Sequence, residues 1–456
     1  MVASVEAALA SGGLSPGQRL PTVRDLAASL GLSPATVASA YRDLRSRGLV
    51  VGEGRRGTRV RDRPPLRFVA PVSAPPGTRD LASGNPDPAL LPDLAAAARR
   101  AAARQAPGLE PAGPRRGARQ GRPSGASLGH PPQPRPLPRL YGAPALLPEL
   151  ADLAREHLAA DGIDPAHLAV VSGALDGVER ALAAWLRPGD AVVVEDPGYA
   201  YIFDLLATMG LRGVPAAMDE EGLVPGALAH ALAGGARAVI ATPRAQNPTG
   251  AAWTATRASE LAAVVSRFPD TLLIEDDHAG PVAGSAALTL GPRARWATVR
   301  SVSKSLGPDL RLALMAGDQT TISRVAGRQA LGPGWVSHHL QEMVATLWSD
   351  PATQALLTRA ETAYAEKRRA LVAALGRQGI PSTGRSGLNV WVPVPAEHPV
   401  VAGLLERGWA VSPGERFRLA SRPGVRVTVS TLQPQEADRL AADLSACLRA
   451  PPARSA

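Results

Sequence analysis

The apolar positions of residues 1–61 predict a small helical domain that ends in a hairpin. Within residues 22–30 the apolar side chains recur at helical spacing, and Gly31 ends the pattern. Ser33 is placed to cap a second helix that starts directly afterwards. Two helices joined this closely are typical of a helix-turn-helix. Residues 49–60 then predict a two-stranded wing.

This pattern favours double-stranded DNA as a partner. The start of the second helix of a helix-turn-helix enters the major groove, and cations of a wing contact phosphates. Paired arginines in a loop are usually only a solvated surface, but here they adjoin two helices of the right spacing. The residues expected near base edges or phosphates are Arg24, Ser33, Ala35, Thr36, Ser39, Arg42, Arg55, Arg56 and Thr58.

The chain from Tyr141 onward alternates short β-like runs with amphipathic helical stretches. This alternation predicts an α/β domain with a mostly parallel sheet covered by helices on both faces, and such sheets bind ligands at the carboxyl ends of their strands. Residues 352–448 predict a smaller α/β domain, with a long helix around 364–375. The expected strands are Leu168–Val171, Ala191–Val194, Ala238–Ala241, Leu272–Ile274 and Ala297–Val302, with two more near 388–394 and 425–429.

Basic charge is concentrated in two segments. The net charge is +10, of which residues 1–67 carry +6 and residues 99–139 carry +8, so the remainder is mildly acidic. Residues 104–138 are rich in Pro, Gly and Arg and almost lack aliphatic side chains, so we expect a disordered basic insertion there. The proline-rich residues 62–79 predict a linker, and residues 449–456 predict a disordered tail.

Composition narrows the class of protein further. The single cysteine, Cys447, excludes an intrachain disulfide and a cysteine-rich metal site, and we expect no metal. The chain does not open with a basic start and an apolar core, and no apolar run reaches about 18 residues. We therefore expect a cytoplasmic protein with no membrane partner.

Lysine is nearly absent, which makes the two lysines of the chain informative. Lys304 and Lys367 stand against 48 arginines. A guanidinium cannot lose its proton and form a Schiff base, so a retained lysine is a candidate nucleophile. Lys367 lies among charged neighbours, where we expect a solvated helix face. Lys304 follows a predicted strand and is the expected reactive amine.

The residues around Lys304 suit an aldehyde cofactor that carries a phosphate. The lysine would capture the aldehyde, and Ser301, Ser303 and Arg311 could bind phosphate oxygens. Other groups follow other predicted strands: a helix start at Ser172-Gly173-Ala174 for the phosphate, the carboxylate of Asp276 for a pyridinium nitrogen, and the amide of Asn247 for a phenolic oxygen. Pyridoxal 5′-phosphate needs these groups.

Two parts of the chain resemble known families. The run Pro16-Gly17-Gln18-Arg19-Leu20-Pro21-Thr22-Val23-Arg24-Asp25-Leu26-Ala27 and the wing Gly57-Thr58 resemble the DNA reader of the GntR superfamily. Residues 80–100 and 140–448 resemble fold-type I aminotransferases, and the combination resembles the MocR subfamily of regulators. The resemblance implies a winged helix-turn-helix at 1–61 and a PLP-dependent transferase fold of type I at 80–448, with a mostly parallel large domain and a smaller C-terminal α/β domain.

The resemblance also implies roles for individual residues. Lys304 matches the Schiff-base lysine, Asp276 the partner of the pyridine nitrogen and Asn247 the contact to the phenolate. Tyr199 matches the aromatic ring that stacks on the cofactor, Tyr141 a tyrosine that reaches the phosphate of the neighbouring subunit, and Arg426 the arginine that binds a substrate or effector carboxylate.

The chain departs from the family at a few positions. The family usually has tyrosine where this chain has His278, whose imidazole could still donate to the phenolic oxygen but titrates nearer neutrality. Ala145-Leu146 stands where a glycine is common, and the insertion falls near the expected substrate entrance. The first helix, residues 4–14, is short for the family, which suggests a truncated start.

Two functions fit these residues. One is a transcription regulator that senses a vitamin B6 form or an amino compound through the cofactor domain. The other is a working aminotransferase with a vestigial reader. The intact reader favours the regulator and His278 weakens the enzyme, whereas a scaffold protein has no support from a retained Schiff-base lysine. Fold-type I sites are built between subunits, so we expect a homodimer.

Overall fold

The computed structural model describes residues 17–46, 49–52, 57–60, 74–105 and 140–449, together with Val5, Ala8 and Leu14. Several predictions therefore fall wholly or mostly outside the described residues: the helix at 4–14, Arg55 and Arg56 of the wing, the linker, the basic insertion and the tail.

The N-terminal unit contains the predicted two helices and a hairpin. Helix α2 (Val23–Leu30) begins after Thr22, whose Oγ1 accepts a hydrogen bond of 3.2 Å from the backbone N–H of Asp25. It ends at Gly31, which adopts the left-handed conformation at φ +65°. Helix α3 (Pro34–Ser46) follows, and β1 (Val50–Gly52) pairs antiparallel with β2 (Thr58–Val60).

The core of this unit comes from α3 and the hairpin. Val37, Leu44 and Val60 are fully buried. Tyr41 is buried beside them, and its hydroxyl donates a hydrogen bond of 2.8 Å to the carbonyl of Pro21. This bond holds α3 against the chain that enters α2.

The large domain is built on an eight-stranded sheet with the order β4-β11-β10-β9-β8-β5-β6-β7. Strands β10, β9, β8, β5 and β6 are parallel neighbours, whereas β11 runs antiparallel to β10 and to β4. This arrangement confirms the predicted α/β class. The strands are β4 (Leu168–Val171), β5 (Ala191–Asp196), β6 (Arg212–Asp219), β7 (Gly222–Leu223), β8 (Ala238–Ala241), β9 (Leu272–Asp277), β10 (Trp296–Ser301) and β11 (Ala313–Gly317).

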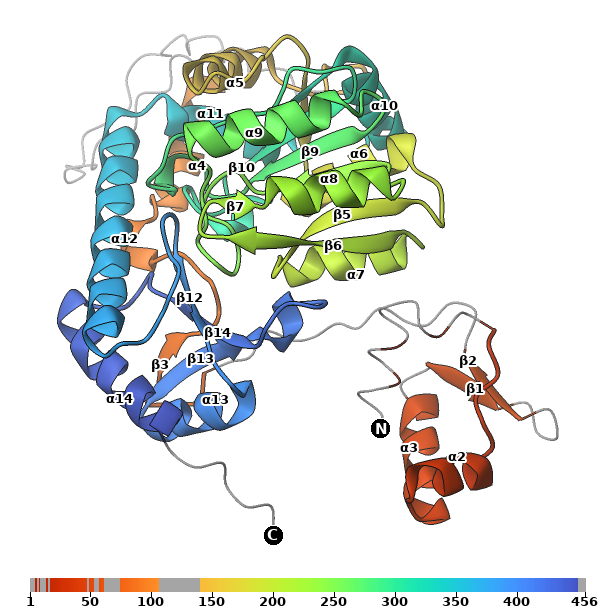
Figure 1. Cartoon of the computed structure of the whole chain (residues 1–456). Coiled ribbons are helices and arrows are strands. Elements are labelled where there is room, and N and C mark those ends of the chain that lie inside the picture. Colours follow the sequence, from red (N-terminus) through yellow and green to blue (C-terminus); the bar gives the residue numbers. More distant parts are fainter. Residues whose placement is uncertain are drawn as a thin grey trace, which may run out of the picture.

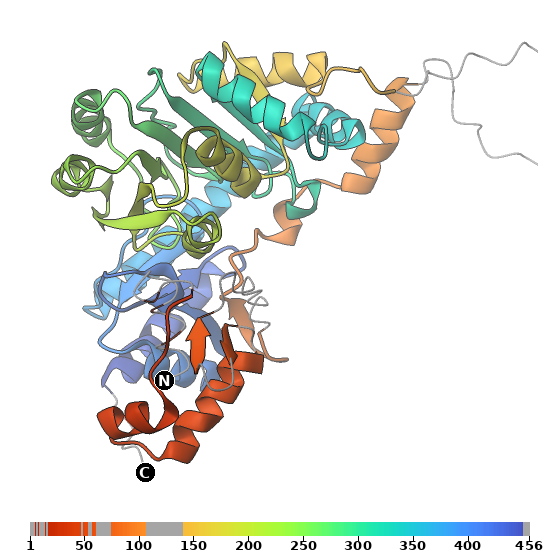
Figure 2. The same ribbon diagram turned by 90° about the vertical axis from the view of Figure 1, so that its right-hand side faces the viewer.

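Helices cover both faces of this sheet, as Figures 1 and 2 show. Successive side chains of a strand point to opposite faces, so Val192 and Val194 of β5 join one apolar core and Val193 joins the other. On the first face lie α6 (Ala174–Trp185), α7 (Ala200–Thr208) and α10 (Gln319–Ala330); on the second lie α8 (Pro225–Ala233) and α9 (Ala255–Ser266).

Three further helices pack together beside the sheet: α4 (Leu94–Gln105), α5 (Pro148–Ala160) and α11 (His338–Trp348). Helix α4 continues through Gln105, so Arg104 and Gln105 are helical and not part of an irregular segment as we expected. Among the described residues, no helix combines the length and apolar character needed to cross a membrane.

The small domain carries a four-stranded sheet with the order β12-β14-β13-β3. Its edge strand β3 comes from the N-terminal side of the large domain and pairs parallel with β13. The sequence did not predict this strand. The elements are β3 (Arg79–Leu81), α12 (Pro351–Arg377), β12 (Asn389–Pro393), α13 (Glu397–Glu406), β13 (Trp409–Pro413), η5 (Gly414–Phe417), β14 (Gly424–Thr428) and α14 (Ala437–Arg449); further short 3-10 helices are η2 (Pro88–Leu90), η3 (Gly280–Val282), η4 (Pro308–Leu310) and η6 (Pro434–Glu436).

The prediction of a solvated Lys367 was wrong. Its side chain is buried on α12, where Nζ donates to Asp87 Oδ2 at 3.0 Å and to the carbonyl of Ser430. A buried ammonium is stable only when it is paired, so Lys367 fastens the segment around Asp87 to the small domain.

Candidate cofactor site

A cavity of about 270 Å³ lies where the carboxyl ends of the parallel strands meet the small domain. This is where ligands bind in sheets of this type. Ten of the residues singled out from the sequence line it: Ala174, Tyr199, Asn247, Asp276, His278, Ser301, Ser303, Lys304, Arg311 and Arg426.

Asp276 presents an unsatisfied carboxyl group to the cavity. Strand β9 continues through Asp277, so Asp276 lies inside the strand and not after it as we expected. Its side chain is 5% exposed, and Oδ1 is buried without a hydrogen-bond partner among the described residues. Burial, and then the charges of Asp277 and Glu195, raise the pKa of Asp276 to about 7. Such a group is stabilised by a cationic N–H placed opposite it.

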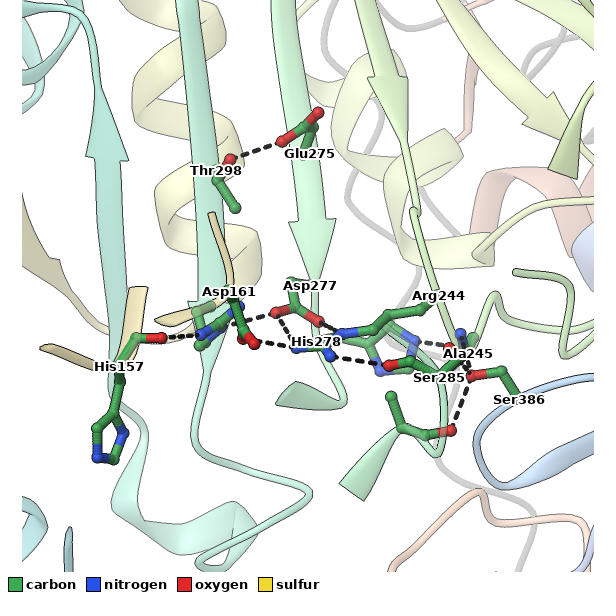
Figure 3. Close-up of polar contacts among 12 residues, drawn as sticks. His157, Asp161, Arg244, Ala245, Glu275, Asp277, His278, Ser285, Thr298 and Ser386 are labelled. Atoms are coloured by element: carbon green, nitrogen blue, oxygen red, sulfur yellow. Dashed lines mark hydrogen bonds and ion pairs between the residues drawn. The ribbon is translucent and has the colours of Figure 1, made fainter. Parts of the chain in front are cut away.

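Asp277, the next residue on β9, faces the side of the sheet opposite to Asp276. It takes part in a buried ion-pair network with Arg244 (Figure 3). It accepts from Arg244 Nε at 2.8 Å and from Arg300 Nε at 2.7 Å, and Arg300 also pairs with Asp161 at 2.7 Å. Burial alone would raise the pKa of Asp277, but the two guanidinium groups hold it well below its ordinary range. The network fixes the end of β9 behind the cavity.

Lys304 reaches the cavity from the loop after β10. Its Nζ donates a hydrogen bond of 2.7 Å to the backbone carbonyl of Gly84. Burial, and then the positive charge of Arg426, lower the pKa of Lys304 to about 8. A larger fraction of this amine is therefore neutral, and nucleophilic, near neutral pH than for an exposed lysine.

His278 is engaged in a way that its sequence position did not indicate. Its Nε2 lies 2.8 Å from the carbonyl of Ala245, as Figure 3 shows, and a carbonyl only accepts, so Nε2 carries the hydrogen. Burial, and then the charge of Lys304, lower the pKa of His278 to about 4, so the ring is neutral at pH 7. The remaining ring nitrogen is then an acceptor. The neutral ring has no second N–H with which to replace a tyrosine hydroxyl as donor.

The guanidinium of Arg311 and the backbone at the start of α6 lie together at one end of the site. Gly173 there has φ +100°, and a Cβ on it would lie only 2.8 Å from a terminal nitrogen of Arg311. The side chain of Arg311 thus lies directly over the helix start, whose N–H groups favour anions. The backbone N–H of Ser172 instead donates to Asp176 at 2.8 Å. Ser172 and Gly173 shape this corner without lining the cavity.

Arg426 enters the cavity from β14 in the small domain. It donates to Asn247 Oδ1 at 3.0 Å and to the carbonyl of Ala82, and it lies over the ring of Phe417 at 4.7 Å. Burial lowers the pKa of Arg426 to about 10, which still leaves it cationic at pH 7. Burial also raises the pKa of Tyr199, on the cavity wall, to about 12. Arg426 is therefore a cation held in place at the wall of the cavity.

Comparisons with known proteins match both units. Residues 1–60 match the model for bacterial regulatory proteins of the gntR family, and residues 131–444 match aminotransferase class I and II. The chain is 37% identical over 451 residues to the vitamin B6 salvage pathway transcriptional repressor PtsJ of Salmonella typhimurium, covering 98% of this chain and 97% of that protein. The chain belongs to the MocR-type regulators.

Other relatives agree with this placement. The chain is 32% identical over 278 residues to the HTH-type pyridoxine biosynthesis transcriptional regulator PdxR of Corynebacterium glutamicum, covering 59% of this chain and 53% of that protein. Its fold is similar to that of LysN, an alpha-aminoadipate aminotransferase of Thermus thermophilus, with a TM-score of 0.65 and 20% identity over 82% of this chain and 93% of that one.

The cofactor of this MocR-type domain is pyridoxal 5′-phosphate, which supplies an aldehyde and an electron-withdrawing ring. The cavity fits it, because the orphaned Asp276 Oδ1 lacks the cationic N–H that a pyridinium would bring. Lys304 and Arg311 line the same cavity, where an amine would take the aldehyde and a guanidinium would take the phosphate.

One residue expected at the cofactor lies outside the cavity, and several residues that line the cavity were not predicted. Tyr141 does not line the cavity; it is 93% exposed and contacts the ring of Trp335 edge-on at 5.7 Å. The sequence did not reveal the cavity-lining residues Ala82, Ser83, Gly84, Tyr201, Arg416 and Phe417. Arg416 had a visible signal, since it lies only ten residues before Arg426.

Most of the residues that we expected to contact DNA are exposed in this MocR-type regulator. Arg24, Ser33, Ala35, Thr36, Ser39 and Arg42 are all exposed. Ser33 caps α3, because its Oγ accepts a hydrogen bond of 3.1 Å from the backbone N–H of Thr36. Thr58 is a correction: it is 8% exposed and accepts a hydrogen bond from Arg45, so its side chain faces the core of the unit rather than DNA.

Proposed function

We propose that this regulator senses a vitamin B6 form, or an amino compound captured by it, and that ligand binding in the cavity changes its affinity for DNA. In this proposal it acts in the cytoplasm as a homodimer, whose paired readers bind two half-sites of an operator. One observation carries it: a buried amine and a buried carboxyl with an unpaired oxygen share one cavity, in a chain whose helix α3 exposes Ala35, Thr36, Ser39 and Arg42.

Each cavity residue has a distinct role in this proposal. Lys304 attaches the cofactor, Asp276 pairs with its ring nitrogen and Asn247 contacts the phenolic oxygen. Arg426 holds the carboxylate of an amino ligand. The ring contact and the phosphate contacts come from Tyr199, Ala174, Ser301, Ser303 and Arg311, and in the dimer Tyr141 of one subunit faces the phosphate of the other.

An active aminotransferase is the second candidate. It is favoured by Arg426, which is already oriented by Asn247 at 3.0 Å. It is disfavoured by His278, whose only ring N–H is bonded to Ala245. The neutral ring of His278 therefore does not replace the tyrosine hydroxyl that the family usually places at this position.

Fluorescence anisotropy with a duplex selected from a random pool separates the two functions. We expect added pyridoxal 5′-phosphate to change the DNA affinity of the full chain by about 5 to 150-fold, the usual range of allosteric coupling. Lys304→Ala should abolish this response. Turnover of amino donors and keto acids at enzyme rates, with a DNA affinity indifferent to the cofactor, would establish the aminotransferase instead.

A further inference from the structure

Strand β3 is the first described strand after the N-terminal DNA-binding unit along the chain, and it is anchored to the small domain. The N–H of Arg79 donates to the carbonyl of Gly408 at 2.8 Å, and its guanidinium pairs with Glu436 at 2.9 Å. Thr431 Oγ1 donates to the carbonyl of Asp80 at 3.3 Å. Strand β3 is thus paired with β13 along one edge and held by Thr431 at Asp80 on the other.

The next three residues, 82–84, enter the cofactor cavity with their backbone. The carbonyl of Gly84 accepts from Lys304 Nζ at 2.7 Å, and that of Ala82 accepts from Arg426. Gly84 has φ +71°, and a Cβ there would lie 3.3 Å from a terminal nitrogen of Arg426. The close approach of this backbone to the site therefore depends on glycine.

Both hydrogen bonds compete with ligands of the site. When the neutral amine of Lys304 condenses with an aldehyde, both of its N–H bonds are replaced by a C=N double bond and one water leaves. The resulting nitrogen carries at most one added proton, so Lys304 loses donors on which Gly84 depends. A ligand carboxylate on Arg426 likewise competes with the carbonyl of Ala82, since a carboxylate is the stronger acceptor.

We propose that residues 82–84 form a latch, held by Lys304 and Arg426 in the ligand-free protein and released when ligand occupies these two side chains. The latch lies between β3 and Asp87, near the point where the chain enters the aminotransferase-like domain from the N-terminal DNA-binding unit. This inference rests on the proposed function and adds the route by which the cavity acts on DNA binding.

Anchors on both sides confine the released segment. Asp80 Oδ1 accepts from the N–H groups of Ala82 at 2.9 Å and Ser83 at 3.0 Å, which shapes the turn locally. Beyond the latch, the N–H of Asp87 donates to the Tyr364 hydroxyl at 3.0 Å, and the carboxylate of Asp87 pairs with Lys367 at 3.0 Å. Release therefore leaves Asp87 and α12 in place, and in this proposal the change is passed to β3, on the side of the latch that leads to the DNA-binding unit.

Two substitutions of one residue test the latch in the full chain. Lys304→Arg removes the reactive amine but keeps a cation that can donate to Gly84. Lys304→Ala removes both. Amide hydrogen exchange of residues 79–87 is measured with and without pyridoxal 5′-phosphate, with β14 peptides as internal control, and DNA affinity is measured on the same samples.

We expect Lys304→Ala without cofactor to resemble the cofactor-loaded wild type, with exchange in residues 79–87 about tenfold faster or more, as for loss of a charged hydrogen bond. Its DNA affinity should shift in the same direction as that caused by cofactor in the wild type. Lys304→Arg should resemble the ligand-free wild type, and neither variant should respond to cofactor.

The latch is overturned if exchange in residues 79–87 is the same in Lys304→Ala and the ligand-free wild type while both proteins keep equal melting temperatures. If cofactor still shifts the DNA affinity of the wild type in that case, the proposed function survives without the latch. If cofactor releases residues 79–87 but leaves DNA affinity unchanged, the latch exists and the regulatory function fails.

Discussion

Replacing Asp276 by Asn should stabilise the ligand-free protein and lower its affinity for the cofactor. The buried carboxyl has no partner for Oδ1, and its pKa is raised from 3.8 to about 7. The folded-state pKa of Asp276 lies above the unfolded value, so the ionised carboxyl lowers the free energy of unfolding. This loss of stability is absent below about pH 4, grows as the pH rises to about 7, and is complete above that pH.

The size of this effect follows from the pKa. A rise from 3.8 to about 7 corresponds to about 4 kcal/mol of lost stability at pH 8. The Asn side chain must itself be buried without partners, at a cost of about 1–3 kcal/mol. We therefore expect Asp276→Asn to gain about 1–3 kcal/mol relative to the wild type at pH 8, and to lose this advantage at pH 4.5.

Cofactor binding should change in the opposite sense. An amide cannot form the charge-assisted bond to a pyridinium, which is worth about 1.5–3 kcal/mol, so cofactor affinity should fall by about 10 to 150-fold. Urea unfolding at both pH values and titration of the visible absorbance measure the two effects. A stability difference that does not change with pH would refute the assignment of Asp276 as an unpaired buried acid.

Three further substitutions test separate parts of the structure. Asp277→Ala should destabilise the protein by about 3–5 kcal/mol in urea unfolding, because it leaves Arg244 and Arg300 buried without their main partner. The control variant Asp152→Ala removes an exposed ion pair and should cost at most about 1 kcal/mol. His278→Tyr should strengthen the visible absorbance of bound cofactor at the expense of its near-ultraviolet band, because a hydroxyl donor stabilises the ionised phenolic oxygen; an unchanged spectrum would contradict this. Arg42→Ala should lower the slope of log DNA affinity against log salt by about 1 without altering cofactor absorbance, and an unchanged slope would remove Arg42 from the phosphate contacts.

The sequence predicted elements with a strong local period better than contacts between distant segments. Helix α2, helix α3 and strand β4 follow the apolar spacing almost residue for residue. The buried position of Thr58 also had a local signal, because Thr58 and Val60 lie two residues apart on one strand and must face the same side. The alternation along β2 therefore places Thr58 on the buried side together with Val60.

The contacts that complete the site had no such signal. Gly84 and Lys304 are 220 residues apart, and Asp87 and Lys367 are 280 apart. Both pairings depend on β3 joining the edge of the small domain, and a three-residue strand after a proline-rich stretch has too few positions to show a period. The scarcity of lysine identified two candidate amines. The predicted strand before Lys304 favoured it as the amine of the site, and it does line the cavity, whereas only the fold showed that Lys367 is buried in an ion pair.

The hydrogen bond from Lys304 to Gly84 bears on the choice between sensor and enzyme. In the proposed function, cofactor attaches to Lys304 only after the bond to Gly84 is broken. An amino ligand binds Arg426 only after the contact of Arg426 with Ala82 is broken. The apparent affinity of the protein for its ligand is therefore reduced by the free energy of the contacts that are lost. For one bond from a charged donor this amounts to about 1.5–3 kcal/mol, or about 10 to 150-fold. A weaker affinity suits a protein that must respond when the free cofactor concentration changes, whereas an enzyme benefits from keeping its cofactor. We therefore expect the purified protein to lose its visible absorbance on dialysis and to regain it in proportion to added pyridoxal 5′-phosphate. A chromophore that stays stoichiometric through prolonged dialysis would show that the competition at Lys304 is too weak to tune the protein as a sensor.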